Sequence, residues 1–145
     1  MPPFRLLDHT ADIAIEATGR TQGATLSEAG IGLSAVLTGR DGRQPWRAEV
    51  PMRFRIEAPE LPSLTVAFLS ELLWLMESKD LLWLGGGVDV AHADDGMWSA
   101  QADGNGLVYD PVRHGQGVEV KAVTYSDLAF ERTRAGWRLR VLLDI

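Results

Sequence analysis

Two short acidic segments, one near each end of the chain, could together bind a metal ion. Asp12 closes the segment Asp8-His9-Thr10-Ala11-Asp12, and Asp144 is followed only by Ile145 with its α-carboxylate. If the fold brings Asp12 beside Asp144, three oxygen-donor groups meet. Oxygen ligands of this kind are the ones that hard divalent cations prefer. The pattern therefore indicates a cation site, and the rest of the chain would be the scaffold that joins the two ends.

Each of these carboxylates also has a simpler interpretation. Asp12 could be an ordinary turn or cap aspartate, because Asp often accepts hydrogen bonds from the nearby backbone. Asp144 could be a solvated residue at the end of a strand. Alternation places it opposite the apolar face of that strand, and so away from the expected core unless both faces are covered; the apolar face is formed by Trp137, Leu139, Val141 and Leu143. Both interpretations stay open for both residues.

Glu119 and Lys121 are a second candidate pair. They stand two apart in a predicted strand and therefore share a face. They form either an exposed ladder of opposite charges, which contributes little stability, or a carboxylate and an ammonium group presented to a partner. From the residues alone the first interpretation is favoured.

Several other chemistries lack the residues that they need. The chain has no cysteine, and its three histidines do not have the spacing of a zinc site. Gly85-Gly86-Gly87 is not followed by the Lys and Ser or Thr of a phosphate-binding loop. No nucleophile, general base or cofactor cradle is evident. A hydrolase that uses the carboxylates of Asp12, Glu119 and Asp144 with a divalent ion is the weakest of the functional hypotheses.

The charge of the chain limits its main partners. The net charge is −6, whereas a protein that mainly binds nucleic acid usually carries a positive balance. One basic stretch stands out around the last predicted turn. It is interpreted as a solvated edge that discourages strand pairing, with a weak contact to RNA or to an acidic partner as the alternative. It consists of Arg132, Arg134, Arg138 and Arg140.

The elements that must position these residues are strands and two helices. The apolar spacing predicts helices over 24–38 and 63–77, the first with a capping box at Thr25 and Glu28 and a C-cap at Gly39. Alternation and turn signals predict strands over 4–8, 13–17, 50–58, 81–84, 88–93, 97–102, 118–125, 128–133 and 137–144, with 103–106 as a loop. This order predicts an α+β fold, a largely antiparallel sheet packed with two helices, in one domain over 1–145.

The first residues lack the basic and apolar regions of a secretion signal, and no stretch is long and apolar enough to span a bilayer. We therefore expect a cytoplasmic protein with no membrane partner.

Four segments together resemble the archease family. They are Asp8 to Ile13, Phe68 to Leu73, Glu119 to Tyr125 and the terminal Leu143-Asp144-Ile145. The resemblance covers the whole chain in order. It implies the archease fold, a sheet packed with two helices, and the function of an accessory protein for the RtcB-type RNA-splicing ligase. Such a protein promotes guanylylation of the ligase and its multiple turnover, and meets RNA only through the ligase.

The resemblance also implies roles for single residues. Asp12, Asp144 and Ile145 match metal-binding positions, and Ile145 would contribute a main-chain or terminal oxygen. Glu119 and Lys121 match the residues needed for ligase activation, together with Asp12 and Asp144. Calcium is the first choice of cation, with magnesium or manganese as alternatives. A role as chaperone or modulator of another tRNA-processing enzyme, such as a tRNA methyltransferase, is the alternative function.

The sequence departs from the family pattern at one position. Family members often carry His after Thr-Tyr, where this chain has Ser126. If that His has a role, His114 is the nearest candidate in the sequence to replace it.

Overall fold

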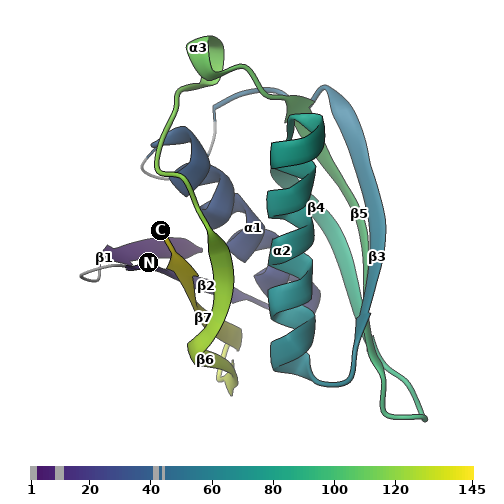
Figure 1. Cartoon of the computed structure of the whole chain (residues 1–145). Helices are drawn as coiled ribbons and strands as arrows, with labels where there is room; N and C mark the ends of the chain where they lie inside the picture. Colours follow the sequence, from purple (N-terminus) through teal and green to yellow (C-terminus); the bar gives the residue numbers. More distant parts are fainter. Residues whose placement is uncertain (1–2, 9–11, 41–42, 44) are drawn as a thin grey trace.

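Two antiparallel sheets form the frame of the molecule. The structure, a computed structural model, describes residues 3–8, 12–40, 43 and 45–145. One sheet has the strand order β1-β2-β7-β6 and the other β3-β5-β4 (Figure 1). The strands are β1 (Phe4–Asp8), β2 (Asp12–Gly19), β3 (Val50–Ala58), β4 (Leu81–His92), β5 (Trp98–Val108), β6 (Ala122–Thr133) and β7 (Gly136–Asp144). The predicted α+β fold with antiparallel pairing is confirmed.

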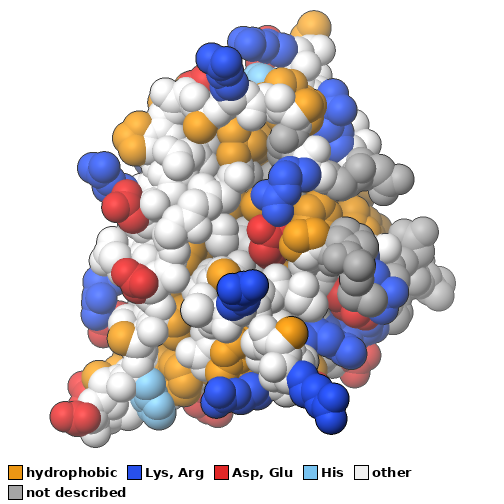
Figure 2. Space-filling view, turned by 180° about the vertical axis from the view of Figure 1, so that it is seen from behind, with side chains coloured by type: hydrophobic (Ala, Val, Ile, Leu, Met, Phe, Trp, Pro, Cys, Tyr) orange, Lys and Arg blue, Asp and Glu red, His pale blue; other side chains and the backbone are white. Residues whose placement is uncertain are grey.

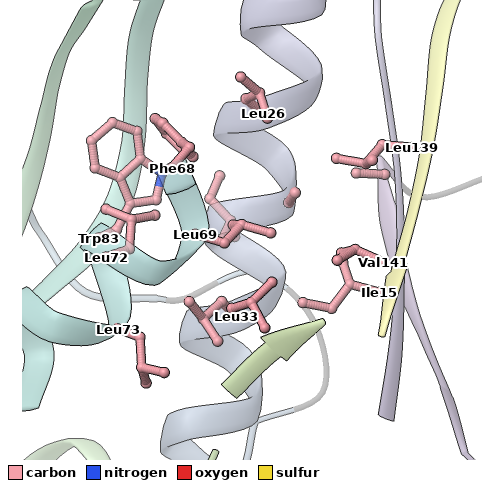
Figure 3. Close-up of a cluster of buried hydrophobic side chains, with 14 of the residues drawn as sticks. Ile15, Leu26, Leu33, Phe68, Leu69, Leu72, Leu73, Trp83, Leu139 and Val141 are labelled. Carbon is pink, nitrogen blue, oxygen red and sulfur yellow. The ribbon is translucent and has the colours of Figure 1, made fainter. Parts of the chain in front are cut away.

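Two long helices lie between the sheets. They are α1 (Gln22–Thr38) and α2 (Leu61–Lys79), and each of them contacts both sheets (Figure 1). The core therefore has two halves that meet on α1. Figure 3 shows Trp83 and Phe68 on one side of this helix and Ile15 and Val141 on the other. None of the helices in the described ranges is long and apolar enough to cross a membrane.

Both long helices begin earlier than the apolar spacing predicted. The hydroxyl of Thr21 accepts a hydrogen bond from the Ala24 amide at 3.0 Å, so the cap of α1 is Thr21 and not Thr25. Helix α2 begins after Glu60, whose amide donates to the Ser63 hydroxyl at 3.1 Å. The predicted end of α1 is confirmed, because Gly39 adopts φ 73° and its amide bonds back into the last turn.

Two glycine-rich segments that were predicted as breaks are strand residues. Gly86 pairs with Gly104, and Gly87 pairs with Asp103, so β4 and β5 run through the predicted gaps. A β-bulge between Trp83 and Gly85 absorbs the irregularity, and Gly85 and Gly86 have φ values of 110° and 141° that favour glycine. The predicted strand break at 85–87 and the loop at 103–106 are therefore wrong.

The segment before β6 also differs from the prediction. Residues 115–121 are not part of a strand, and β6 begins at Ala122 instead of Val118. A short helix, α3 (Pro111–His114), adds a third helix to the two expected ones. β6 continues to Thr133 as one strand, and an irregular stretch between Thr124 and Ala129 leaves the ladder with β7. Between the predicted strands over 4–8 and 13–17, residues 9–11 lie outside the described residues, and Asp12 is the first residue of β2 and not part of a turn.

Candidate functional site

The fold brings the two candidate carboxylates at the chain ends together. Strands β2 and β7 are antiparallel neighbours, and Asp12 pairs directly with Asp144 at the end of their ladder. Residues directly opposite each other in an antiparallel pair point to the same face, with Cβ atoms about 4.5–5.5 Å apart. The two carboxylates therefore face solvent from one spot on the sheet.

This spot is on the outer face of the sheet, as alternation predicted, but it is not fully solvated. Asp12 and Asp144 are both half-buried, and the neighbouring pair on the same face, Ala14 and Leu142, is buried. Like charges placed directly opposite each other destabilise a sheet, and partial burial strengthens that repulsion. A bound cation between the carboxylates would remove it.

The end of the chain and the segment before β6 meet beside this pair. The Lys121 amide donates to the Asp144 carbonyl at 2.7 Å, and Ala122 pairs with Asp144. The Lys121 side chain is exposed. Ile145 packs its side chain partly against the core. Lys121 and Ile145 are thus next to the acidic pair along the backbone.

Glu119 lies in different surroundings. It is exposed and lines a hollow of about 270 Å³ with Leu37, Met76 and Tyr109. Within the described part of the chain, no three side chains of His, Asp or Glu gather as metal ligands, so Glu119 does not join Asp12 and Asp144 as a third acidic ligand. In the same hollow, burial and then the charge of Asp110 raise the pKa of the Tyr109 hydroxyl, which donates to the Gly115 carbonyl at 2.5 Å.

An ion-pair network on the same sheet face was not predicted. Glu16 is 9% exposed, and its carboxylate accepts hydrogen bonds from Arg5 at 3.1 Å and from Arg140 at 3.3 Å. These arginines are the register partners of Glu16 in β1 and β7. The sequence offers only the opposite charges of Glu16 and the two arginines as a signal. The strand order shows that the three side chains meet. Arg140 was predicted to be solvated like the other arginines around the last turn. It is instead half-buried in this network.

His114 does not replace the missing family histidine. Its ring is 2% exposed, its Nδ1 accepts from the Asp110 amide at 3.0 Å, and it packs edge-on against Trp46. It therefore holds α3 in place and presents no surface to a partner. Ser126 is exposed in the irregular stretch of β6.

Comparison with known proteins gives a consistent result. A model described as the archease protein family (MTH1598/TM1083) matches residues 4–145. The protein archease of Methanosarcina mazei is 32% identical over 142 residues, covering 98% of this chain and 95% of its own. That of Danio rerio is 28% identical over 143 residues, covering 98% of this chain and 85% of its own.

Two solved structures share the fold. The solution structure of Methanobacterium thermoautotrophicum protein 1598 superposes with a TM-score of 0.78 at 26% identity and covers 100% of both chains. The crystal structure of a Thermotoga maritima archease, described as a possible chaperone, has a TM-score of 0.50 at 19% identity. It covers 96% of this chain and 94% of its own.

Proposed function

This chain belongs to the archease family, and on that premise we propose that it is a metal-binding accessory protein that activates an RtcB-type RNA ligase. In this proposal the protein promotes guanylylation of the ligase and supports its multiple turnover. It performs no catalytic step of its own.

The single observation that carries the metal-binding part is the direct pairing of Asp12 with Asp144. Two half-buried carboxylates on one face, one residue from a terminal carboxylate, have the donor chemistry of a hard-cation site. Asp12, Asp144 and the main-chain end of Ile145 would hold the ion. Calcium is our first choice, with magnesium or manganese as alternatives. The cation would supply charge neutralisation and a defined docking surface, because the repelling carboxylates then point at one shared ion.

The partner-facing role falls on the residues that surround this end of the sheet. Lys121 is exposed and its backbone is hydrogen-bonded to Asp144, so its ammonium group would be available to a partner that docks at this end of the sheet. Glu119, two residues earlier, would contact the ligase at the edge of the hollow that it lines. The net charge of −6 favours rapid encounter with a basic partner.

A ligation assay with substoichiometric ligase tests this proposal. Adding the protein should raise the number of turnovers per ligase, and Asp12→Ala or Asp144→Ala should abolish that increase while the far-ultraviolet circular dichroism is unchanged. Asp94→Ala, which removes one exposed carboxylate from the β4–β5 turn, is the matched control and should stimulate fully. Equal turnover with and without the wild-type protein would contradict the proposal.

A second candidate function is that of a chaperone or modulator of another tRNA-processing enzyme, such as a tRNA methyltransferase. It is favoured by the description of the Thermotoga maritima structure as a possible chaperone. Affinity purification of the protein from its own cells distinguishes the two. Recovery of a ligase supports the first function, and recovery of a methyltransferase without a ligase supports the second.

A further inference from the structure

The end of the β2–β7 ladder opposite the acidic pair has a different character. There Gly19 pairs with Trp137, seven residue pairs from Asp12 and Asp144, which is about 23 Å along the strands. Trp137 is half-buried and lines two separate hollows of about 320 and 340 Å³. Arg20 lines both hollows as well. Trp137 and Arg20 thus both border the same two hollows.

Exposed arginines lie at the same end of the sheet as this tryptophan. The Arg132 guanidinium lies 5.9 Å from the centre of the indole ring, a cation–π distance, and Phe130 packs edge-on against the same ring. Arg20 and Arg134 are exposed at the same end of the sheet, Arg20 directly after β2 and Arg134 in the β6–β7 turn. We name these four residues the arginine–tryptophan surface: Arg20, Arg132, Arg134 and Trp137.

The local charge is positive although the protein is acidic. Among the described residues, Asp89 lines one hollow and is outnumbered by the three arginines of this surface. Glu131 and Arg138 pair across the β6–β7 ladder on the opposite face of the sheet. The start of α1, at Gln22 and Gly23, lines the same hollow as Asp89 and has no acidic residue in its first turn. Its helix dipole adds to the attraction for anions. In Figure 2 the side chains of Lys and Arg gather at the lower end of the molecule.

We propose that the arginine–tryptophan surface binds single-stranded RNA. Arginines that follow a groove contact phosphates, and an aromatic ring beside them stacks on unpaired bases without regard to sequence. An acidic protein segment would use the arginines but would leave the tryptophan and the two hollows that it lines without a role. A single strand fits both features, because one nucleotide can stack on the indole while the flanking phosphates lie against Arg20 and Arg134.

The choice of RNA rests on the proposed function, because the partner ligase acts on RNA. The resemblance of the chain to its family implies contact with RNA only through the ligase, and this inference adds a direct contact. The acidic end would engage the ligase while the opposite end holds a substrate strand. The overall charge of −6 opposes RNA, so the contact is weak and serves to orient a strand that the ligase already binds.

Binding is measured on the protein alone, by fluorescence anisotropy of a labelled 12-nucleotide oligouridine between 25 and 200 mM salt. Because no ligase is present, failure here leaves the proposed activation untouched. We expect affinity to fall with salt, with a log–log slope of about −2 to −3 for three or four phosphate contacts. Arg20→Gln with Arg134→Gln should make that slope shallower by about 1.4 and weaken binding roughly tenfold at low salt. Trp137→Leu should weaken binding roughly fivefold or more.

Arg53→Gln with Arg55→Gln is the matched control, since it removes two exposed arginines from the outer face of the other sheet. It should leave the salt slope unchanged. The inference is overturned if wild type does not bind at 25 mM salt, or if the control pair loses as much affinity as the Arg20/Arg134 pair. It is also overturned if polyglutamate displaces the RNA at equal charge concentration and Trp137→Leu has no effect, because the surface would then fit an acidic protein.

Discussion

Three carboxylates on the outer face of the four-stranded sheet differ in what neutralises them. Glu16 accepts hydrogen bonds from two arginines, one in each neighbouring strand. Asp12 instead faces Asp144, another carboxylate. Asp12 and Glu16 both lie on β2, and only Ala14 stands between them on that face. The arginines therefore satisfy one acidic group and leave the other pair with a charge that a cation can neutralise.

Shortening the chain by Ile145 tests the contribution of its terminal carboxylate. The deletion moves that carboxylate onto Asp144 and changes the position of the third oxygen donor, so we expect weaker calcium binding. Ile145→Ala is the control, because it removes the side chain that packs partly against the core but keeps the terminal carboxylate in place. Calcium-induced stabilisation in a thermal melt should persist in Ile145→Ala and shrink in the deletion. Equal stabilisation in both would show that the terminal carboxylate is no ligand.

At the scale of elements, Trp83 explains why β5 carries glycine at position 104. A Cβ atom at Gly104 would overlap the Trp83 ring, so the indole lies where a side chain of β5 would otherwise stand. On the opposite side, Gly30 of α1 lets the helix approach the same ring, and the Trp83 Nε1 donates to the Ser27 carbonyl at 3.1 Å. The glycines leave room for the indole, and its packing offsets the weak strand preference of glycine.

Replacing Gly104 by Ala should therefore destabilise the fold. The added methyl group must displace Trp83 in the core, and overpacking of this kind costs about 1–3 kcal/mol. Gly87→Ala in the neighbouring strand is the control, because its Cβ would meet only the Asp103 carbonyl oxygen at 3.5 Å, an ordinary contact. Urea unfolding should show a lower midpoint for Gly104→Ala and a nearly unchanged one for Gly87→Ala. The same midpoint in both variants would argue against the role assigned to Trp83.

For the whole molecule, the β2–β7 ladder separates two surfaces of opposite charge. The acidic pair stands at one end and the arginine–tryptophan surface at the other. Both depend on the same two strands, yet the distance between them exceeds the range over which substitutions usually influence each other. The screening length of about 8 Å at physiological salt also separates their electrostatic effects.

The two ends should consequently behave as independent sites. Asp12→Ala should lose the calcium-induced rise in melting temperature and keep the salt-dependent binding of oligouridine. Arg20→Gln with Arg134→Gln should show the reverse pattern. Thermal melts with calcium and anisotropy titrations on both variants provide the check. If either substitution changed both measurements by a similar factor, the ladder would be a coupled unit instead.

Much of the fold is predictable where a local pattern is strong. The alternation over 50–58 and the C-cap at Gly39 are both found in the structure. Helix starts were placed too late because the capping residues Thr21 and Glu60 precede the first apolar turn. The strand through Gly85 to Gly87 is not predicted, because a run of glycines indicates a turn when only the sequence is considered. What makes those residues a strand is their pairing with β5, where Gly86 lies close against the Gly104 backbone, and that pairing is set by tertiary packing.

The sequence by itself determined the kinds of groups that this protein can use: carboxylates at both ends, arginines around one tryptophan, and no cysteine. The tertiary structure decided which of them meet. Asp12 and Asp144 are opposite each other because β2 pairs with β7 across the length of the chain, while Glu119 lies apart from them in its own hollow. A side chain's chemistry is local, but its neighbours are set by strand order and register, which long-range packing of the core selects.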